Sequence, residues 1–386
     1  MRFPQGPYEN TVWRVWLSMT AVVVAGGGLG ASTTAAVLGI MVAPFLVAPV
    51  TTRARSAPLV PALAASALAW TALSLVWSPY ERPDQALKLL LLTPLFALVV
   101  ISAARTDDRS AALRLRWAAG AVLAVSAYFL IELASGGAIA TWAKMTLEGH
   151  GPRAYAASLG ERTLARGLTG HVLIAGPVVA ALLSRRQPVS NALAGLIAAV
   201  AVTGAVTFNV TANTASIFAG AAAAGLAWRY GGQALGALCF IVAGSIAAAP
   251  LYMAAITLLT GEETAAALPL SWHMRLEIWR FTLEQISAAP VFGHGLDASR
   301  VLGEAAELRG VAYDRLPLHP HNHGLQIWLE TGFAGAALFS AAAAALGWRC
   351  MGAKLDPVTA AGVAFCVAAY LTTVAIGSGV WQEWLH

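Results

Sequence analysis

The sequence predicts an all-α protein that crosses a membrane many times. Of its 386 residues, 58% are hydrophobic and only 11% are charged, whereas soluble globular domains carry about 25% charged residues. A chain with so few charges cannot keep most of its surface in contact with water. Apolar runs of about 20 residues, the length of helix that crosses a bilayer, recur along the whole sequence. We therefore expect a single polytopic membrane domain over residues 1–386.

The apolar runs predict eleven transmembrane helices, within a range of ten to twelve. They lie at residues 11–28, 33–50, 58–76, 86–104, 117–135, 167–184, 190–208, 212–228, 233–259, 324–347 and 357–380. Alanine and glycine are abundant in them, which allows the close helix approach that stabilises membrane proteins. The first run could be a signal peptide, but ten more follow it, so we interpret it as an uncleaved first span.

The basic residues predict which side of the membrane each loop faces. With the N-terminus in the cytoplasm, thirteen Lys and Arg residues fall on the cytoplasmic side, and the short outer loops hold only Arg82 and Lys88. Cytoplasmic loops carry such an excess, so the net charge of +5 reflects topology and gives no reason to expect nucleic acid as a partner. Two longer outer loops remain, residues 136–165 and 261–323, and polar chemistry is expected there.

The second outer loop contains a predicted amphipathic helix over residues 271–287. Its apolar residues recur at spacings of four and three and form one stripe: Trp272, Leu276, Trp279, Leu283 and Ile286. Arg280 falls away from the stripe beside Glu277 and Glu284, where a solvated ion pair is expected. Arg275 lies at the edge of the stripe, with no carboxylate nearby on its own helix. A side chain reaching past apolar surface is the commoner arrangement for such an arginine, and an anion ligand is the alternative.

A polar cluster, HPHNHGLQIWLETGFAG, precedes and enters the run at 324–347. Asn322 is a good N-cap for this helix, and the positive end of the helix dipole favours an anion such as phosphate. Gln326 and Glu330 follow at successive steps of four residues. A carboxylate within a membrane span is costly unless it is paired or hydrated, so Glu330 indicates a polar network. Gly332 and Gly335 would permit close packing of a neighbouring helix.

The three histidines of this cluster allow three interpretations. They could bind a metal, but the alternating positions His319, His321 and His323 do not fix a tetrahedral geometry, and no cysteine or aspartate completes the set. They could form an inert cluster at a helix cap. The third interpretation, a general base beside a helix-terminal anion site, suits a side chain whose pKa lies near neutrality. The scattered cysteines predict neither a disulfide framework nor a zinc site.

These motifs resemble those of the bacterial O-antigen ligases, within the wider O-antigen ligase and polymerase superfamily. The spacing of His321-Asn322, nine residues, Gly332, two residues and Gly335 carries the resemblance, with His319-Pro320, Leu325-Gln326 and Trp328–Glu330 around it. Upstream, the block of Arg275, Trp279, Pro290, Gly293 and Gly295 is similar to the block before the histidine motif in that family. Arg166, in LARGLTGHVL, resembles an earlier family arginine.

The resemblance implies a metal-independent, inverting membrane glycosyltransferase with a GT-C-like fold, in the bacterial inner membrane with its active site facing the periplasm. The donor would be a glycan on undecaprenyl diphosphate and the acceptor a hydroxyl of lipid A-core or another glycan, with membrane lipid as a further partner. His321 would be the catalytic base, and Arg275 and Arg166 would bind the diphosphate. Supporting roles would fall to Asn322, Gln326, Glu330 and His319. No metal and no cofactor is expected.

Two other functions compete with this one. A polymerase of O-antigen or exopolysaccharide would use the same donor and the same chemistry, and nothing in the residues separates it from a ligase. A transporter of lipid-linked sugar would place polar groups at the membrane midplane on broken helices. Here the polar residues collect at one face, which favours chemistry at the interface over transit.

Overall fold

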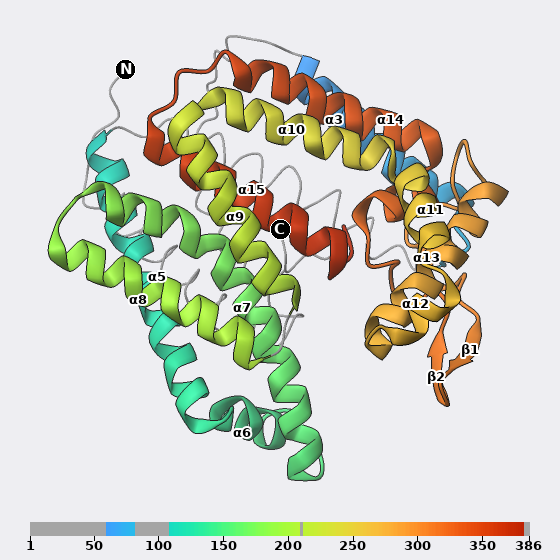
Figure 1. Ribbon diagram of the computed structural model, residues 1–386, viewed down its shortest axis with the longest axis horizontal. Coiled ribbons are helices and arrows are strands. Elements are labelled where there is room, and N and C mark those ends of the chain that lie inside the picture. The colour runs from blue at the N-terminus through green and yellow to red at the C-terminus, as the bar shows by residue number, and fades with distance from the viewer. Residues whose placement is uncertain (1–58, 82–107, 209–210, 382–386) are drawn as a thin grey trace.

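The computed structural model describes residues 59–81, 108–208 and 211–381, and it is almost entirely helical (Figure 1). The predicted spans at 11–28, 33–50 and 86–104, with Arg82 and Lys88, lie outside the described residues. In chain order the elements are α3 (Leu59–Leu73), η1 (Ser74–Trp77), α5 (Asp108–Ser135), α6 (Ala138–Thr146), α7 (Arg153–Ser184), α8 (Pro188–Thr207), α9 (Thr211–Tyr230), α10 (Gly232–Ala247), α11 (Ala249–Leu259), α12 (Glu262–Ala267), α13 (Leu270–Ala288), η2 (Ala298–Arg300), β1 (Ala305–Leu308), β2 (Val311–Asp314), α14 (His323–Met351) and α15 (Pro357–Ile376).

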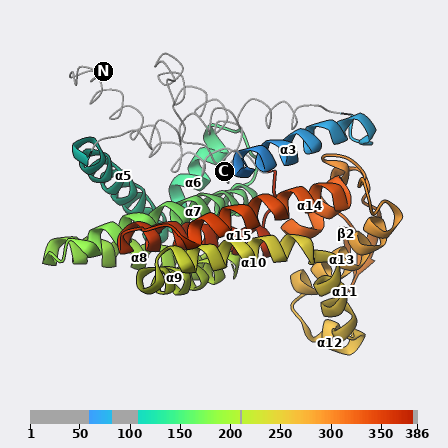
Figure 2. The ribbon, with the colours of Figure 1, turned by 90° about the horizontal axis from the view of Figure 1, so that it is seen from above.

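The long helices form two groups joined by α15. In one group, α14 packs against α10 on one side and against α3 on the other, and the three run side by side in Figure 1. In the other, α7 packs against α5, α6 and α8 around an apolar core that includes Phe129, Leu164 and Leu168. Helix α15 contacts α7 and α9 and lies between the groups. Figure 2 shows α10, α14 and α15 as neighbouring long helices.

Five of the described helices are long and apolar enough to cross a membrane, and up to seven spans result if two bent helix pairs are each counted as one. The five are Leu59–Trp77, Arg153–Ser184, Pro188–Thr207, His323–Met351 and Pro357–Ile376. Helix α9, where the sequence predicts a span at 212–228, does not pass that test, and polar residues such as Asn213 and Ser216 lower its hydropathy. The structure therefore supports a polytopic membrane protein but not the count of eleven spans.

Both bent pairs differ from the straight spans and loops that the sequence predicts. Helix α5 turns by 89° into α6, across Gly136 and Gly137, which both have positive φ. The Glu132 carboxylate accepts the backbone N–H groups of Ile139 and Ala140, at 3.2 and 2.8 Å, and so satisfies the start of α6. The predicted span 233–259 is likewise broken, because α10 and α11 meet at 70°, where Pro250 has no N–H to continue a helix.

The segment 136–165, predicted to be the first outer loop, is mostly helical. Helix α6 occupies its first part, and α7 begins at Arg153, well before the predicted span at 167–184. Lys144, in the last turn of α6, forms an ion pair with Glu148 in the short stretch between these helices, with Nζ 2.6 Å from Oε1. Helix α7 thus extends beyond its apolar part by several turns.

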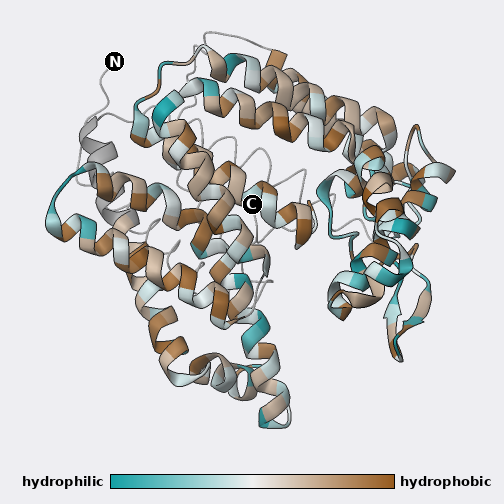
Figure 3. Cartoon of the chain, in the orientation of Figure 1, coloured by the Kyte–Doolittle hydropathy of each residue, from teal (hydrophilic) through white to brown (hydrophobic). Residues whose placement is uncertain are grey.

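Helices α11, α12 and α13, the turn η2 and the β1–β2 hairpin form a lobe at one end of the long helices (Figure 1). The strands pair antiparallel, with Ala305 opposite Asp314 and Leu308 opposite Val311. Figure 3 shows hydrophilic residues concentrated in this lobe. Helix α13 lies where the sequence predicts the amphipathic helix, but Ile278 and Phe281, off the predicted stripe, are also buried, because neighbouring parts of the lobe cover that side.

Helix α14 is broken at Gly332, whose φ of 64° and ψ of −167° no regular helix contains. The segment 290–295 fills the break. A Cβ on Gly332 would lie 2.3 Å from the carbonyl oxygen of Val291, so this position requires glycine for the break itself and not for the helix packing that the sequence suggests. Four backbone hydrogen bonds join the two segments: Phe333 to Pro290 (2.9 Å), Ala334 to Val291 (3.1 Å), His294 to Leu329 (2.8 Å) and Gly295 to Glu330 (2.9 Å).

Candidate active site

His321 lies in the loop that leads into α14, and its ring has a fixed tautomer when neutral. Its Nδ1 atom is 2.9 Å from the carbonyl oxygen of Gly377. A carbonyl oxygen only accepts hydrogen bonds, so Nδ1 carries the proton and Nε2 keeps its lone pair. Within the described residues Nε2 makes no hydrogen bond, and unlike Nδ1 of His323 it is not sealed from solvent. The arrangement therefore presents an unprotonated imidazole nitrogen.

His319 is packed against His321, with ring centroids 4.4 Å apart and nearly perpendicular planes. The backbone N–H of His321 donates to Nδ1 of His319 at 3.2 Å, so His319 carries its neutral-state proton on Nε2. Burial, followed by the charges of His321, Arg300 and Arg275, lowers the pKa of His319 to about 3. His319 is therefore a neutral N–H donor at physiological pH and not a second base. The backbone of His321 has a φ of 55°, a strained value for a residue with a side chain.

Burial also lowers the pKa of His321, and the charge of Arg275 lowers it further, while the hydrogen bond to Gly377 raises it. The net direction is downward from 6.5. An imidazole must be unprotonated to accept a proton, so this downward shift of the pKa leaves His321 able to accept one at neutral pH.

The predicted N-cap and the third histidine have structural partners. Asn322 Oδ1 accepts the backbone N–H of Leu325 at 3.0 Å, which confirms Asn322 as the N-cap of α14. Its Nδ2 donates to the carbonyl of Ala375 at the end of α15, at 3.4 Å. His323 is buried and its Nε2 lies 2.9 Å from Oγ of Ser245 on α10. His323 therefore ties two helices together.

The segment Gly377–Trp381, which we call the strap, follows α15 and crosses the first turns of α14. The predicted span at 357–380 ends earlier, at Ile376. The Val380 N–H donates to Oε1 of Gln326 at 2.9 Å, and the Trp381 indole donates to Oε2 of Glu330 at 2.5 Å. A Cβ on Gly379 would meet the ring of His319 at 3.0 Å. The strap therefore contacts the histidine loop and two polar residues of α14, Gln326 and Glu330.

Glu330 is completely buried, and its carboxylate accepts four hydrogen bonds. Oε1 accepts from Ser299 Oγ at 2.8 Å and from Gln326 Nε2 at 3.2 Å. Oε2 accepts from the Asp297 backbone N–H at 3.1 Å and from the Trp381 indole. Three of these partners can only donate, an arrangement that suits an ionised carboxylate. Glu330 thus joins α14, the η2 turn and the strap.

Arg275 is half-buried on α13 and has no carboxylate partner among the described residues. Nη1 donates to the Ser271 carbonyl at 3.2 Å, Nε is buried without a partner, and the guanidinium lies 5.1 Å from the Trp272 ring centre. One turn along α13, the Trp279 indole donates to the carbonyl of Pro320 at 3.0 Å, which holds α13 against the histidine loop. Burial lowers the Arg275 pKa, as expected for a charge kept from water without a counter-ion.

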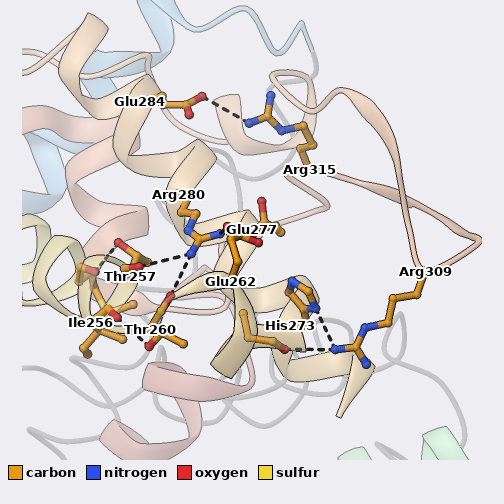
Figure 4. Close-up of polar contacts among 12 residues, drawn as sticks. Ile256, Thr257, Thr260, Glu262, His273, Glu277, Arg280, Glu284, Arg309 and Arg315 are labelled. Carbon is orange, nitrogen blue, oxygen red and sulfur yellow. Dashed lines mark hydrogen bonds and ion pairs between the residues drawn. The ribbon is translucent and has the colours of Figure 1, made fainter. Parts of the chain in front are cut away.

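Three other arginines of the lobe, Arg280, Arg309 and Arg315, have structural partners, shown in Figure 4. Arg280 was predicted to be a solvated pair with Glu277 and Glu284. It does pair with Glu277, at 2.5 Å, and also with Glu262 at 3.0 Å, but its Nη2 donates to carbonyls at the end of α11, at 3.1 and 3.4 Å. Glu284 instead pairs with Arg315, at 3.4 Å. Arg280 is therefore an internal tie of the lobe and not a surface pair.

The comparisons with known proteins match the region of the chain that contains these residues. Residues 160–340 match the family model described as O-antigen ligase, and this segment contains Arg166, Arg275, His321 and Glu330. This segment, somewhat under half of the chain, is similar to the O-antigen ligase family.

Curated proteins similar to the chain come from Rickettsia. A Rickettsia typhi protein named as a candidate polysaccharide ligase is 30% identical over 174 residues, which cover 40% of this chain and 42% of that protein. A Rickettsia prowazekii protein with the same description is 31% identical over the same shares. A Rickettsia conorii protein so described is 40% identical over 82 residues, 20% of each chain. The chain thus spans less than half the length of these relatives. No solved structure matches it significantly.

Arg166, the third residue taken from the O-antigen ligase motifs, is exposed on α7. Within the described part of the chain, no hydrogen bond or ion pair joins it to the histidine loop. Its neighbour Ala165 accepts a hydrogen bond from Asn213 Nδ2 at 3.3 Å, and the adjacent Ala212 packs against Gly377. This part of α7 is therefore linked to Gly377, whose carbonyl binds His321, through two contacts: Ala165 with Asn213, and Ala212 with Gly377.

Sequence reasoning missed the strap and the η2 turn. The strap reads Gly-Ser-Gly-Val-Trp after an apolar run, and two glycines followed by a tryptophan could have indicated a tight bend with an anchored ring. Ser299, which binds Glu330, carries no comparable signal. Among the described residues no three His, Cys, Asp or Glu side chains are placed to hold a metal ion.

Proposed function

We propose that the protein is a glycosyltransferase of the O-antigen ligase type. It transfers a glycan from undecaprenyl diphosphate to a hydroxyl of lipid A-core at the periplasmic face of the bacterial inner membrane, without a metal and with inversion at the anomeric carbon. One observation carries the proposal: an open, unprotonated imidazole nitrogen on His321 lies near Arg275, a cation with no carboxylate partner. The similarity of residues 160–340 to the O-antigen ligase family supports the proposed substrate class.

The two residues fit the two needs of such a transfer. The acceptor oxygen attacks the anomeric carbon while its proton moves to Nε2 of His321. The bond from that carbon to the diphosphate oxygen breaks, and the electron pair leaves with the diphosphate. The leaving group gains negative charge, which the forked donors of Arg275 can bind. Because the leaving group is stable as an anion, no general acid is needed.

Arg275 is well prepared for this role. A half-buried guanidinium without a counter-ion is unfavourable in the free protein, so an anionic ligand that restores its hydrogen bonds gains that lost energy on binding. The indole of Trp272 covers one side of the guanidinium. Arg166 is the second candidate for the diphosphate, because α7 approaches the strap through Ala165 and Asn213. Four more residues support the site. Asn322 caps α14, Gln326 and Glu330 form the polar network, and His319 is a neutral N–H donor.

Reconstitution tests the proposal. The purified chain in lipid nanodiscs is given an undecaprenyl-diphosphate-linked glycan and lipid A-core, with and without EDTA, and the products are analysed by mass spectrometry. We expect lipid A-core that carries the glycan, at the same rate in EDTA. Joining of two lipid-linked glycans without acceptor glycosylation would identify a polymerase. Movement of the donor across a sealed membrane with no new glycosidic bond would identify a transporter, and either result would overturn the proposal.

A further inference from the structure

The strap has no role in the transfer as described so far, yet it supplies the only described hydrogen bond to the ring of His321. The bond joins Nδ1 of His321 to the carbonyl of Gly377. This carbonyl belongs to the backbone, so its position depends on what holds the strap. Immediately before it, α15 fixes one end, because the N–H groups of Gly377 and Ser378 donate to the Thr373 carbonyl at 2.8 and 3.0 Å.

The other end of the strap is anchored to α14, the helix that His321 precedes. The indole of Trp381 binds the buried carboxylate of Glu330, and the backbone of Val380 binds Gln326. Trp381 is itself buried against Leu296 and Phe339. The two contacts lie one and two turns into α14, so the strap is held at both ends with Gly377 beside the histidine loop.

We propose that the strap is the positioning element of His321, and that Glu330 acts on the base through Trp381 and Gly377. Held in place, the Gly377 carbonyl keeps the proton on Nδ1, directs Nε2 to the substrate, and stabilises the imidazolium that forms when Nε2 takes the acceptor proton. This inference rests on the proposed role of His321 as base. It assigns functions to Trp381 and Gly379, and it explains why a carboxylate is buried in α14.

The geometry argues against a purely structural Glu330. A carboxylate in the interior is costly, and apolar packing would join the helices at lower cost. Its partners come from the segments that border the histidine loop: Ser299 from η2, whose Oγ also donates to the Leu318 carbonyl at 3.0 Å, Gln326 from α14, and Trp381 from the strap. The carboxylate thus fixes the loop from both sides.

Trp381→Phe tests the inference, because it keeps an aromatic side chain but removes the indole N–H together with part of the ring volume. Trp328→Phe, on α14, is the matched control: it makes the same change in ring size and removes an indole hydrogen bond to the Ile246 carbonyl at 2.8 Å, which does not involve Glu330. For Trp381→Phe we expect kcat to fall about 10- to 100-fold with the donor KM within about twofold. Trp328→Phe should retain kcat.

The pH profile separates positioning from general destabilisation. The charged and titratable groups that face His321 among the described residues are His319 in its own loop and Arg275 from α13, with Arg300 from η2 acting on His319. The Gly377 bond raises the His321 pKa, so its loss should move the acid limb of kcat/KM to lower pH. A variant that is only less stable would show the acid limb of kcat/KM at the same pH as wild type.

A tautomer measurement makes the test independent of transfer. Full-length protein with 15N-labelled imidazoles is studied in nanodiscs, and the His321 signals are assigned by difference from His321→Gln. We expect wild type to show a protonated Nδ1 and an unprotonated Nε2, and Trp381→Phe to show mixed tautomers. If Trp381→Phe does not fold, Gln326→Met releases the strap at its second contact with α14, the hydrogen bond from Val380.

The outcomes are distinct. A Trp381→Phe protein with the wild-type tautomer and the wild-type acid limb would overturn the inference, even if its activity falls. If Trp381→Phe changes the tautomer but the wild-type protein transfers no glycan, the strap positions His321 as proposed and the proposed function is wrong.

Discussion

His321 and Gly377 lie 56 residues apart in the chain, yet Nδ1 of the first is 2.9 Å from the carbonyl oxygen of the second. The contact brings the start of α14 and the end of α15 together and decides which ring nitrogen is basic. A histidine at the mouth of a membrane helix could bind a metal, cap a helix or take a proton. The hydrogen bond to Gly377, with Nε2 left free, favours the last of these.

His321→Ala should leave the protein inserted and folded but lower the rate of glycan transfer by about 10²- to 10⁴-fold, the usual loss for a general base. The side chain is replaced in a loop, so the helices keep their packing. The rate is measured with purified protein and lipid A-core, and folding by size-exclusion chromatography. His150→Ala, at a partly exposed position between α6 and α7, is the control and should retain the wild-type rate. Near wild-type transfer by His321→Ala would remove His321 from the catalytic role.

The acid limb of the pH profile should report His321 and respond to Arg275. The free base is the active form, so kcat/KM should fall as pH drops through the His321 pKa, which lies below its ordinary 6.5 because of burial and of Arg275. Arg275→Gln removes a positive charge, which makes the imidazolium less unfavourable and raises that pKa. The acid limb of the variant should therefore lie at higher pH than that of wild type, and its donor KM should rise.

Arg275→Lys sharpens this test. Lysine keeps the charge, so the acid limb should stay close to that of wild type, but it cannot reproduce the forked hydrogen bonds of a guanidinium. We expect the donor KM to rise in both variants and the limb to move only in Arg275→Gln. If the acid limb of kcat/KM in Arg275→Gln lies at the wild-type pH, the charge of Arg275 does not affect the pKa of His321.

The parts of the site that depend on neighbours in sequence could be predicted. Asn322 caps α14 because a cap needs only the residues that follow it, and α13 follows from the spacing of Trp272, Leu276 and Trp279. The burial of Glu330 follows from its place within an apolar run. In each case a local rule links residue type to structure.

The parts that depend on distant segments could not be predicted. Nothing near His321 indicates that the carbonyl of Gly377 will reach its ring. The break in α14 at Gly332 needs the turn at 290–295 to take over its hydrogen bonds, so the helix alone gives no reason for it. Arg280 looks like a surface residue on a helical projection of α13, but α11 and α12 cover it in the folded lobe.

Arg280→Ala should destabilise the lobe with no direct effect on the chemistry. It removes ion pairs to Glu277 and Glu262 and donors to two carbonyls of α11. We expect the midpoint of thermal unfolding to fall by at most about 2–4 °C, because ~1 kcal/mol causes a shift of that size in a protein of 150–250 residues and a smaller one in a longer chain. Arg162→Ala, on an exposed part of α7, is the control and should not shift the midpoint. At a temperature where both variants are folded, Arg280→Ala should transfer glycan faster than Arg275→Ala.

Gly332→Ala should prevent the correct folding of α14. At φ 64° a Cβ is strained, and here it would lie 2.3 Å from the Val291 carbonyl oxygen, so the 290–295 turn must leave the break. Its departure would release the backbone bonds to Leu329 and Glu330. The yield of monodisperse protein after extraction is the measurement, and we expect it to fall severalfold.

Gly244→Ala is the control for that substitution, because Gly244 is a helical glycine of α10 with open space where its Cβ would lie. Alanine favours the helix there, so the yield should equal or exceed that of wild type. If Gly332→Ala gave a normal yield and normal transfer, α14 could pass Gly332 as a regular helix, and the turn at 290–295 would not be needed to hold Glu330 beneath the histidine loop.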